Sequence, residues 1–197
     1  MNVLCIGAHC DDVEVGLGGT ILHHIERGDT VVSLVMSGSN IRAEESREAG
    51  DALGVGEVLI FDFEDTIIPA GVEAIRTIEN IIKKLKPDRV YTHTTKDTHQ
   101  DHRNTGLASL SAARNISQVL FYQSAPPKSW TFSPNHYVDI SKYMARKLEA
   151  VKLFHSQSDK WFMNPDVLRS MARFRGLEAG VEYAEAFEIY KMLEVYP

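Results

Sequence analysis

The chain has 197 residues, of which 44% are hydrophobic and 24% charged, and its 27 acidic against 21 basic side chains give a net charge of −6. This composition is typical of one globular domain and excludes disordered, collagen-like and coiled-coil chains. An acidic surface repels phosphate backbones, so we expect no nucleic acid among the partners of this protein.

The cysteines and the apolar runs bear on the compartment. Cys5 and Cys10 are the only cysteines and lie too close in sequence for a disulfide framework, which favours a reducing environment. No apolar run approaches the roughly 18 residues that cross a bilayer. The N-terminus lacks the basic region of a signal peptide. We therefore expect a cytoplasmic protein without a membrane partner.

Apolar runs of strand length alternate with stretches of helical period, which predicts an α/β fold with a mostly parallel sheet. In chain order, the pattern predicts a strand at 3–7, a helix at 15–27, a strand at 30–36, a helix at 43–53 and a strand at 57–61. It continues with a helix at 75–85, a strand at 88–93, a helix at 104–115, a strand at 118–122, and helices at 143–154 and 166–177. The proline-containing stretch 124–134 predicts a loop or an extended edge, and 184–193 fits a helix or a strand. Without a linker or a repeat, residues 1–197 are expected to form one domain.

Two clusters of histidine and aspartate each follow a predicted strand. The first is His9, Asp11 and Asp12, and the second is Asp97, His99, Asp101 and His102. In open α/β sheets, ligands bind outside the carboxyl ends of the strands. Both clusters can therefore meet in one crevice, although about ninety residues separate them.

These residue types suit a divalent metal ion. A catalytic zinc ion usually has three histidine or carboxylate ligands and an open position for water. His9 and Asp12 are three residues apart and can point the same way, which leaves Asp11 free. His99 and His102 have the same spacing, so that one binds the ion while the other stands beside it. Zn²⁺ is the expected ion, with Fe²⁺, Mn²⁺ and Co²⁺ as alternatives.

Structural roles compete with this interpretation. An acidic pair at a helix start also caps the helix, although two such clusters at one sheet edge favour a metal site. His23 and His24 fall within a predicted helix and are expected to be structural or exposed. His93 ends a predicted strand, and its side chain could either line a pocket or pack in the interior. His136 lies in a predicted loop and has no assigned role.

The glycines after the first strand lack the spacing of a dinucleotide site. Gly16, Gly18 and Gly19 do not form G-x-G-x-x-G, and the neighbouring aspartates would repel a pyrophosphate. We expect these glycines to let a helix pack closely on the sheet. Cys10 has no sequence feature that marks an activated nucleophile.

The motifs resemble those of the LmbE-like, PIG-L-type zinc deacetylases. His9-Cys10-Asp11-Asp12 with Gly18-Gly19-Thr20 resembles the His-Pro-Asp-Asp and Gly-Gly-Thr motifs of that family, and Asp97-x-His99-x-Asp101-His102 resembles its second motif. Further residues follow the order of the family along nearly the whole chain: Arg42, Glu45, Ala49, Leu53, Gly54, Asp65, Lys147, 155–157, Arg175, Gly176 and 183–187. Two residues depart from the pattern, since Cys10 replaces a proline and Glu14 comes one position late.

The resemblance implies a Rossmann-like fold with helices on both faces of the sheet, and a set of ligands. His9, Asp12 and His102 correspond to the zinc ligands of the family. Asp11 corresponds to its general base, and His99 to the histidine that stabilises the oxyanion.

The mechanism that these roles suggest also needs supporting residues. Asp97 or Asp101 is expected to orient His99 and keep it protonated. Arg42 and Asp65 are expected to contact the sugar, although a charge at a helix start and a loop carboxylate explain them nearly as well.

The function implied is removal of an acetyl group from the nitrogen of an amino sugar of the N-acetylglucosamine type. The expected partner is therefore a small N-acetylated sugar, and a homo-oligomer is also open, with 124–134 as a candidate interface. Two alternatives are a metal-dependent phosphoesterase that uses the same residues and a non-catalytic module that binds a sugar or a nucleotide.

Overall fold

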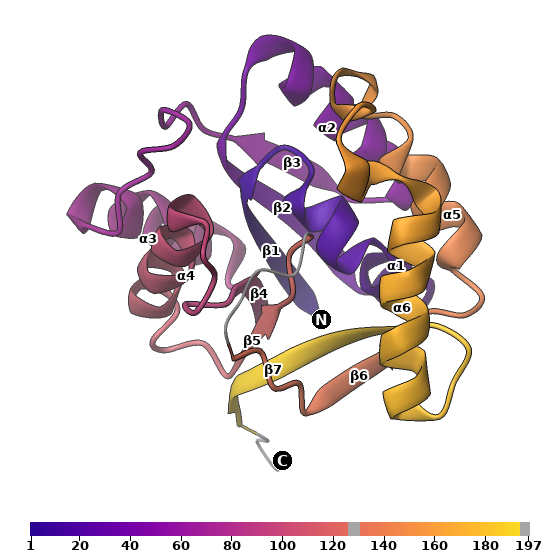
Figure 1. The fold of residues 1–197 in the computed structure, drawn as a ribbon. Coiled ribbons are helices and arrows are strands. Elements are labelled where there is room, and N and C mark those ends of the chain that lie inside the picture. The colour runs from indigo at the N-terminus through magenta and orange to yellow at the C-terminus, as the bar shows by residue number, and fades with distance from the viewer. Residues whose placement is uncertain (126–130, 194–197) are drawn as a thin grey trace.

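A seven-stranded sheet forms the centre of the protein, whose computed structural model describes residues 1–125 and 131–193 (Figure 1). The strand order is β3-β2-β1-β4-β5-β7-β6, with parallel pairing from β3 to β5 and antiparallel pairing of β7 with both of its neighbours. The strands are β1 (Asn2–His9), β2 (Thr30–Ser37), β3 (Glu57–Ile60), β4 (Arg89–His93), β5 (Gln118–Tyr122), β6 (His136–Asp139) and β7 (Ala184–Met192). The prediction of an α/β fold with a mostly parallel sheet is confirmed.

Helices cover both faces of this sheet (Figure 1). One layer contains α1 (Asp12–Glu26), α2 (Asn40–Leu53), α5 (Met144–Val151) and α6 (Pro165–Ala179), and the other contains α3 (Val72–Leu85) and α4 (Gln100–Ala112). Successive β1 residues alternate between the layers, since Cys5 packs into the first apolar cluster and Leu4 into the second. No helix in the part of the chain that the structure describes has the length and apolar character needed to span a membrane.

The helices begin earlier than their apolar period predicts. α1 begins at Asp12 rather than at 15, and α4 begins at Gln100 rather than at 104. Polar residues of the two clusters form these first turns, so the apolar pattern becomes visible only one turn later. α2 and α3 also begin earlier than predicted, each by three residues, at Asn40 and Val72.

The C-terminal half contains two strands that the sequence left open or missed. The segment 184–193 is mostly the strand β7, and His136 begins the edge strand β6 instead of lying in a loop. β6 has four residues of intermediate or full exposure and, within residues 1–125 and 131–193, pairs only with β7, so it carries no clear alternation of apolar side chains. Of the predicted loop 124–134, positions 126–130 lie outside the described residues, and the rest contains no helix or strand.

A buried carboxylate caps a break inside α1. The helix is kinked at Leu17, and the backbone N–H groups of Gly19 and Thr20 donate to the Glu185 carboxylate on β7, at 3.0 and 2.7 Å. Lys147 Nζ on α5 lies 2.6 Å from the same carboxylate, and both charged side chains are at most 5% exposed. The ion pair therefore joins α1, α5 and β7 inside the core.

Gly16 allows α1 to lie directly against the sheet. A Cβ at this position would lie 2.6 Å from Cδ2 of the fully buried Tyr122 ring, whose hydroxyl donates to Ile6 O at 3.0 Å. We expect Gly16→Ala to lower the free energy of unfolding by about 1–3 kcal/mol, the usual cost of overpacking. Urea denaturation measures the change, with Gly56→Ala as the control because its Cβ would meet no atom closer than 3.4 Å. Equal stability of the two variants would contradict the packing argument.

Candidate metal centre

The two polar clusters meet at the carboxyl end of the sheet. β1 ends at His9, and α1 begins three residues later. β4, the neighbour of β1, ends at His93, and its connection to α4 contains Asp97 and His99. The parallel pairing of β1 and β4 therefore brings the two clusters to one edge.

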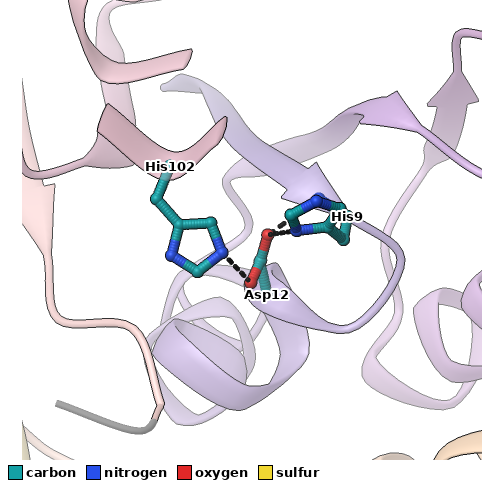
Figure 2. Close-up of side chains that lie close together, drawn as sticks. All are labelled: His9, Asp12 and His102. Carbon is teal, nitrogen blue, oxygen red and sulfur yellow. Dashed lines mark hydrogen bonds and ion pairs between the residues drawn. The ribbon is translucent and has the colours of Figure 1, made fainter. Parts of the chain in front are cut away.

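His9, Asp12 and His102 converge at this edge (Figure 2). Each offers a ligand atom, and these atoms all lie within 4.8 Å of one another. Asp12 lies between the two rings, with Oδ2 3.4 Å from His9 Nδ1 and Oδ1 3.3 Å from His102 Nε2. Two overlapping trios, with His99 and Asp101 or with His93 and Asp97, also cluster among the described residues. Only the first trio lines the adjoining cavity with all of its members.

In both His9 and His102, the ring nitrogen that does not face Asp12 lies close to another carboxylate. His102 Nδ1 lies 3.1 Å from Asp97 Oδ2, and His9 Nε2 lies 3.2 Å from Asp101 Oδ2. Asp101 is itself fixed by the backbone N–H groups of Thr66 and Ile68, at 2.7 and 3.0 Å. Carboxylates that orient imidazoles in this way are typical of metal sites. The donor set and its support thus fit a divalent ion such as zinc.

The charges of the trio also favour a cation. Burial lowers the pKa of His102, but the carboxylates of Asp12 and Asp97 outweigh it and raise this pKa to about 10. Burial raises the pKa of Asp12, while His102 and His93 hold it well below its usual value. Without a metal, His102 therefore holds a proton between two carboxylates, and a divalent ion would displace that proton.

The role of Asp97 can be measured through metal affinity. We expect Asp97→Asn to weaken binding of Zn²⁺ by about 10- to 100-fold, because the His102 ring loses the charge that orients it. Competition with a chromophoric chelator measures the affinity, and Asp51→Asn on the exposed end of α2 is the control. An unchanged affinity in the Asp97 variant would contradict the orienting role.

Asp11 lies in the cavity outside the trio. Its side chain is buried beside Arg42, whose Nη2 is 3.6 Å from Asp11 Oδ2. Burial and the neighbouring Asp12 raise the pKa of Asp11. A carboxylate of this kind is suited to accept a proton near the trio.

His99 lines the same cavity, but its orientation differs from the expectation. Its Nδ1 accepts the backbone N–H of Asp101 at 3.3 Å and caps α4. The carboxylates of Asp97 and Asp101 bond His102 and His9 instead, so neither orients the His99 ring. Burial and the neighbouring His102 lower the pKa of His99, which disfavours the protonated ring. Because Nδ1 accepts, the neutral ring places its proton on Nε2.

The cavity has a volume of about 240 Å³ and a wall built from distant segments. Arg42 and Asp65 both line it, with Arg42 Nη1 3.5 Å from Asp65 Oδ2. Arg42 Nε is buried without an acceptor among the described residues. The guanidinium is thus positioned to bind an oxygen of a ligand.

The cavity is also lined by Lys160 and Phe162, which the sequence did not indicate. They follow the short helix η1 (His155–Gln157), and Phe162 belongs to η2 (Trp161–Met163). Ser156 ties this segment to α2, since its N–H and Oγ donate to the Glu45 carboxylate at 2.7 and 2.6 Å. In the sequence, only the resemblance of Glu45 and residues 155–157 to the family motifs indicated that this segment lies near the site.

His93 lies behind the trio rather than in the cavity wall. It is fully buried, its Nε2 is 3.1 Å from Asp12 Oδ2, and its ring stacks on His102 with centroids 4.1 Å apart. Of the two roles left open by the sequence, packing describes it better. His24 is also structural, since it is buried and bonds Asp29 and Tyr91.

Comparison with known proteins identifies the family of this chain. The PIG-L family, described as GlcNAc-PI de-N-acetylase, matches residues 4–113, which is more than half of the chain and includes both clusters. The chain belongs to the PIG-L family. This PIG-L protein is 31% identical to diacetylchitobiose deacetylase of Thermococcus kodakarensis, over 93% of this chain and 81% of the relative.

Solved structures agree with the PIG-L assignment. The N,N′-diacetylchitobiose deacetylase from Pyrococcus horikoshii has a TM-score of 0.85 and 28% identity, over 95% of this chain and 83% of that one. GalB, the 4-carboxy-2-hydroxymuconate hydratase of Pseudomonas putida, has a TM-score of 0.89, covering 100% of this chain and 98% of that one. GalB is only 18% identical to the PIG-L protein, so it shares the fold alone.

Proposed function

We propose that this protein is a zinc-dependent N-deacetylase that hydrolyses the acetamide of an N-acetylated amino sugar. The observation that carries the proposal is the convergence of His9, Asp12 and His102 in a cavity that Asp11 and His99 also line. Membership of the PIG-L family and similarity to two diacetylchitobiose deacetylases support this reaction and the type of substrate.

His9, Asp12 and His102 would hold the ion. When bound, zinc would polarise the amide carbonyl and lower the pKa of water towards neutrality, two effects that are absent when an amide is hydrolysed without a catalyst. His9 and His102 keep their ligand nitrogens turned inward because Asp101 and Asp97 hold the opposite ones.

Asp11 acts as the general base. It accepts a proton from the attacking water and later returns it to the amine that leaves. Its burial and the proximity of Asp12 raise its affinity for that proton, while Arg42 keeps the carboxylate from becoming neutral too readily.

His99 stabilises the carbonyl oxygen as negative charge develops on it. The backbone N–H of Asp101 occupies Nδ1, so Nε2–H is the group that donates to this oxygen. One such donor contributes roughly 2.7–4 kcal/mol to the transition state. Arg42 and Asp65 contact hydroxyl groups of the sugar from the same wall of the cavity.

An acetate-release assay tests the proposal. We expect the metal-loaded protein to release acetate from some members of a panel of N-acetylglucosamine derivatives, and to lose this activity with a chelator and regain it with Zn²⁺. Phosphate release from phosphorylated sugars without acetate release would favour a phosphoesterase. A protein that binds the sugar but neither hydrolyses it nor contains stoichiometric metal would favour a non-catalytic module.

A further inference from the structure

One hydrogen-bond donor to the Asp97 carboxylate comes from the end of β5, a strand that contains none of the candidate site residues. Asp97 Oδ1 accepts the backbone N–H of His99 at 2.8 Å, and Asp97 Oδ2 lies 3.1 Å from Nδ1 of His102. The hydroxyl of the buried Ser124, two residues beyond β5, donates to the same Oδ2. Both oxygens of the carboxylate are therefore engaged.

Ser124 is the donor that ties Asp97 to the sheet. His99 and His102 belong to the same stretch of chain as Asp97, so their contacts can move together with it. The contact with Ser124 joins that stretch to the end of β5, which is the neighbour of β4 in the sheet. A hydrogen bond to a charged carboxylate is also stronger than one between neutral groups. Without the Ser124 hydroxyl, the donors that remain to Asp97 in the described part of the chain all lie within residues 97–102.

The position of Ser124 is itself fixed by its neighbours. Nε and Nη2 of Arg175 on α6 donate to the side-chain oxygen of Gln123, at 3.1 and 2.8 Å, and the Arg175 side chain is largely buried. One residue earlier, the hydroxyl of Tyr122 donates to a backbone carbonyl of β1. The end of β5 is thus held both from α6 and from β1, which keeps Ser124 turned toward Asp97. Arg175 is one of the residues that follow the family order, and this contact connects it to the candidate site.

We propose that Ser124 is a positioning residue for His102, on which it acts through Asp97. Its hydroxyl holds the carboxylate against Nδ1 of the His102 ring, and this directs Nε2 of the ring toward Asp12 Oδ1, 3.3 Å away. Outer partners of this kind orient the ligands of metal sites. The inference rests on the proposed function, because it takes His102 as a ligand of the ion.

The affinity for Zn²⁺, measured by competition with a chromophoric chelator, tests the proposal. We expect Ser124→Ala to weaken binding by about tenfold, as the loss of an outer partner does. Ser124→Thr keeps the hydroxyl and should bind Zn²⁺ several-fold more tightly than Ser124→Ala. Ser33→Ala on β2 is the matched control and should bind like the unchanged protein, because Ser33 is fully buried and its Oγ has no partner among the described residues. Unweakened binding in Ser124→Ala, or equal losses in the alanine and threonine variants, would overturn the proposal.

A double-mutant cycle tests whether Ser124 acts through Asp97. Asp97→Ala removes the acceptor, so Ser124→Ala in that background should change the affinity for Zn²⁺ by less than about twofold. An equal loss in both backgrounds would show that Ser124 acts independently of Asp97 and would overturn the proposal. Circular dichroism of each metal-free variant shows that it is folded.

Failure of this inference and failure of the proposed function give different results. An unchanged protein that binds no Zn²⁺ would contradict both. If the unchanged protein binds Zn²⁺, His102→Ala loses it and Ser124→Ala keeps the full affinity, then only the role of Ser124 is wrong.

Discussion

Replacing Asp11 with asparagine is expected to lower kcat for acetate release by about 10²- to 10⁴-fold while the content of bound metal stays unchanged. Asparagine preserves the size of the side chain but cannot accept a proton from water. Because Asp11 belongs to none of the close trios of candidate ligands, the loss should affect turnover and not metal retention. Steady-state kinetics and elemental analysis of the same preparation measure the two quantities.

His102→Ala gives the opposite pattern and so distinguishes a ligand from a base. This variant removes one of the three donors and should lose the metal together with activity. Full metal content in His102→Ala would remove this residue from the ligand set. A normal kcat in Asp11→Asn would contradict the assignment of Asp11 as the general base. Asp51→Asn is the control for a general effect of the lost negative charge.

The second large effect is expected in stability. Glu185→Ala should lower the free energy of unfolding by about 3–5 kcal/mol, because it leaves the Lys147 ammonium buried and unpaired. It also removes the acceptor of two N–H groups at the break in α1, those of Gly19 and Thr20. Urea denaturation of the metal-saturated protein measures the change.

A double variant separates the two contributions. Glu185→Leu with Lys147→Met removes both charges and should recover part of the lost stability, since apolar replacements of a buried pair are often tolerated. Recovery should be incomplete because Gly19 and Thr20 still lack an acceptor. Unaltered stability of Glu185→Ala would contradict the capping role.

The regular part of the fold could be predicted because burial leaves a periodic record in the sequence. The five parallel strands were located to within a few residues, since each is an apolar run between the two layers of helices. The helix starts were missed where Asp12 and Gln100 belong to polar motifs. β6 was missed because an exposed edge strand needs no apolar alternation.

At the candidate site, the sequence indicated which residues meet but not how they pair. The position of each cluster after a strand was sufficient to place His9 and His102 at one edge. Which carboxylate serves which imidazole depends on angles that only the folded chain sets, and here Asp97 faces His102 rather than His99. Lys160 was missed because it reaches the cavity from an irregular segment without a motif.

The attachment of Ser156 to Glu45 separates one wall of the cavity from the candidate ligands. The residues proposed to retain the ion belong to β1, α1 and α4, whereas Lys160 and Phe162 arrive on a separate tethered segment. Insertions or replacements after residue 157 can therefore reshape this wall of the cavity without moving the candidate ligands. Transplanting this short stretch between relatives offers a direct route to altered substrate preference.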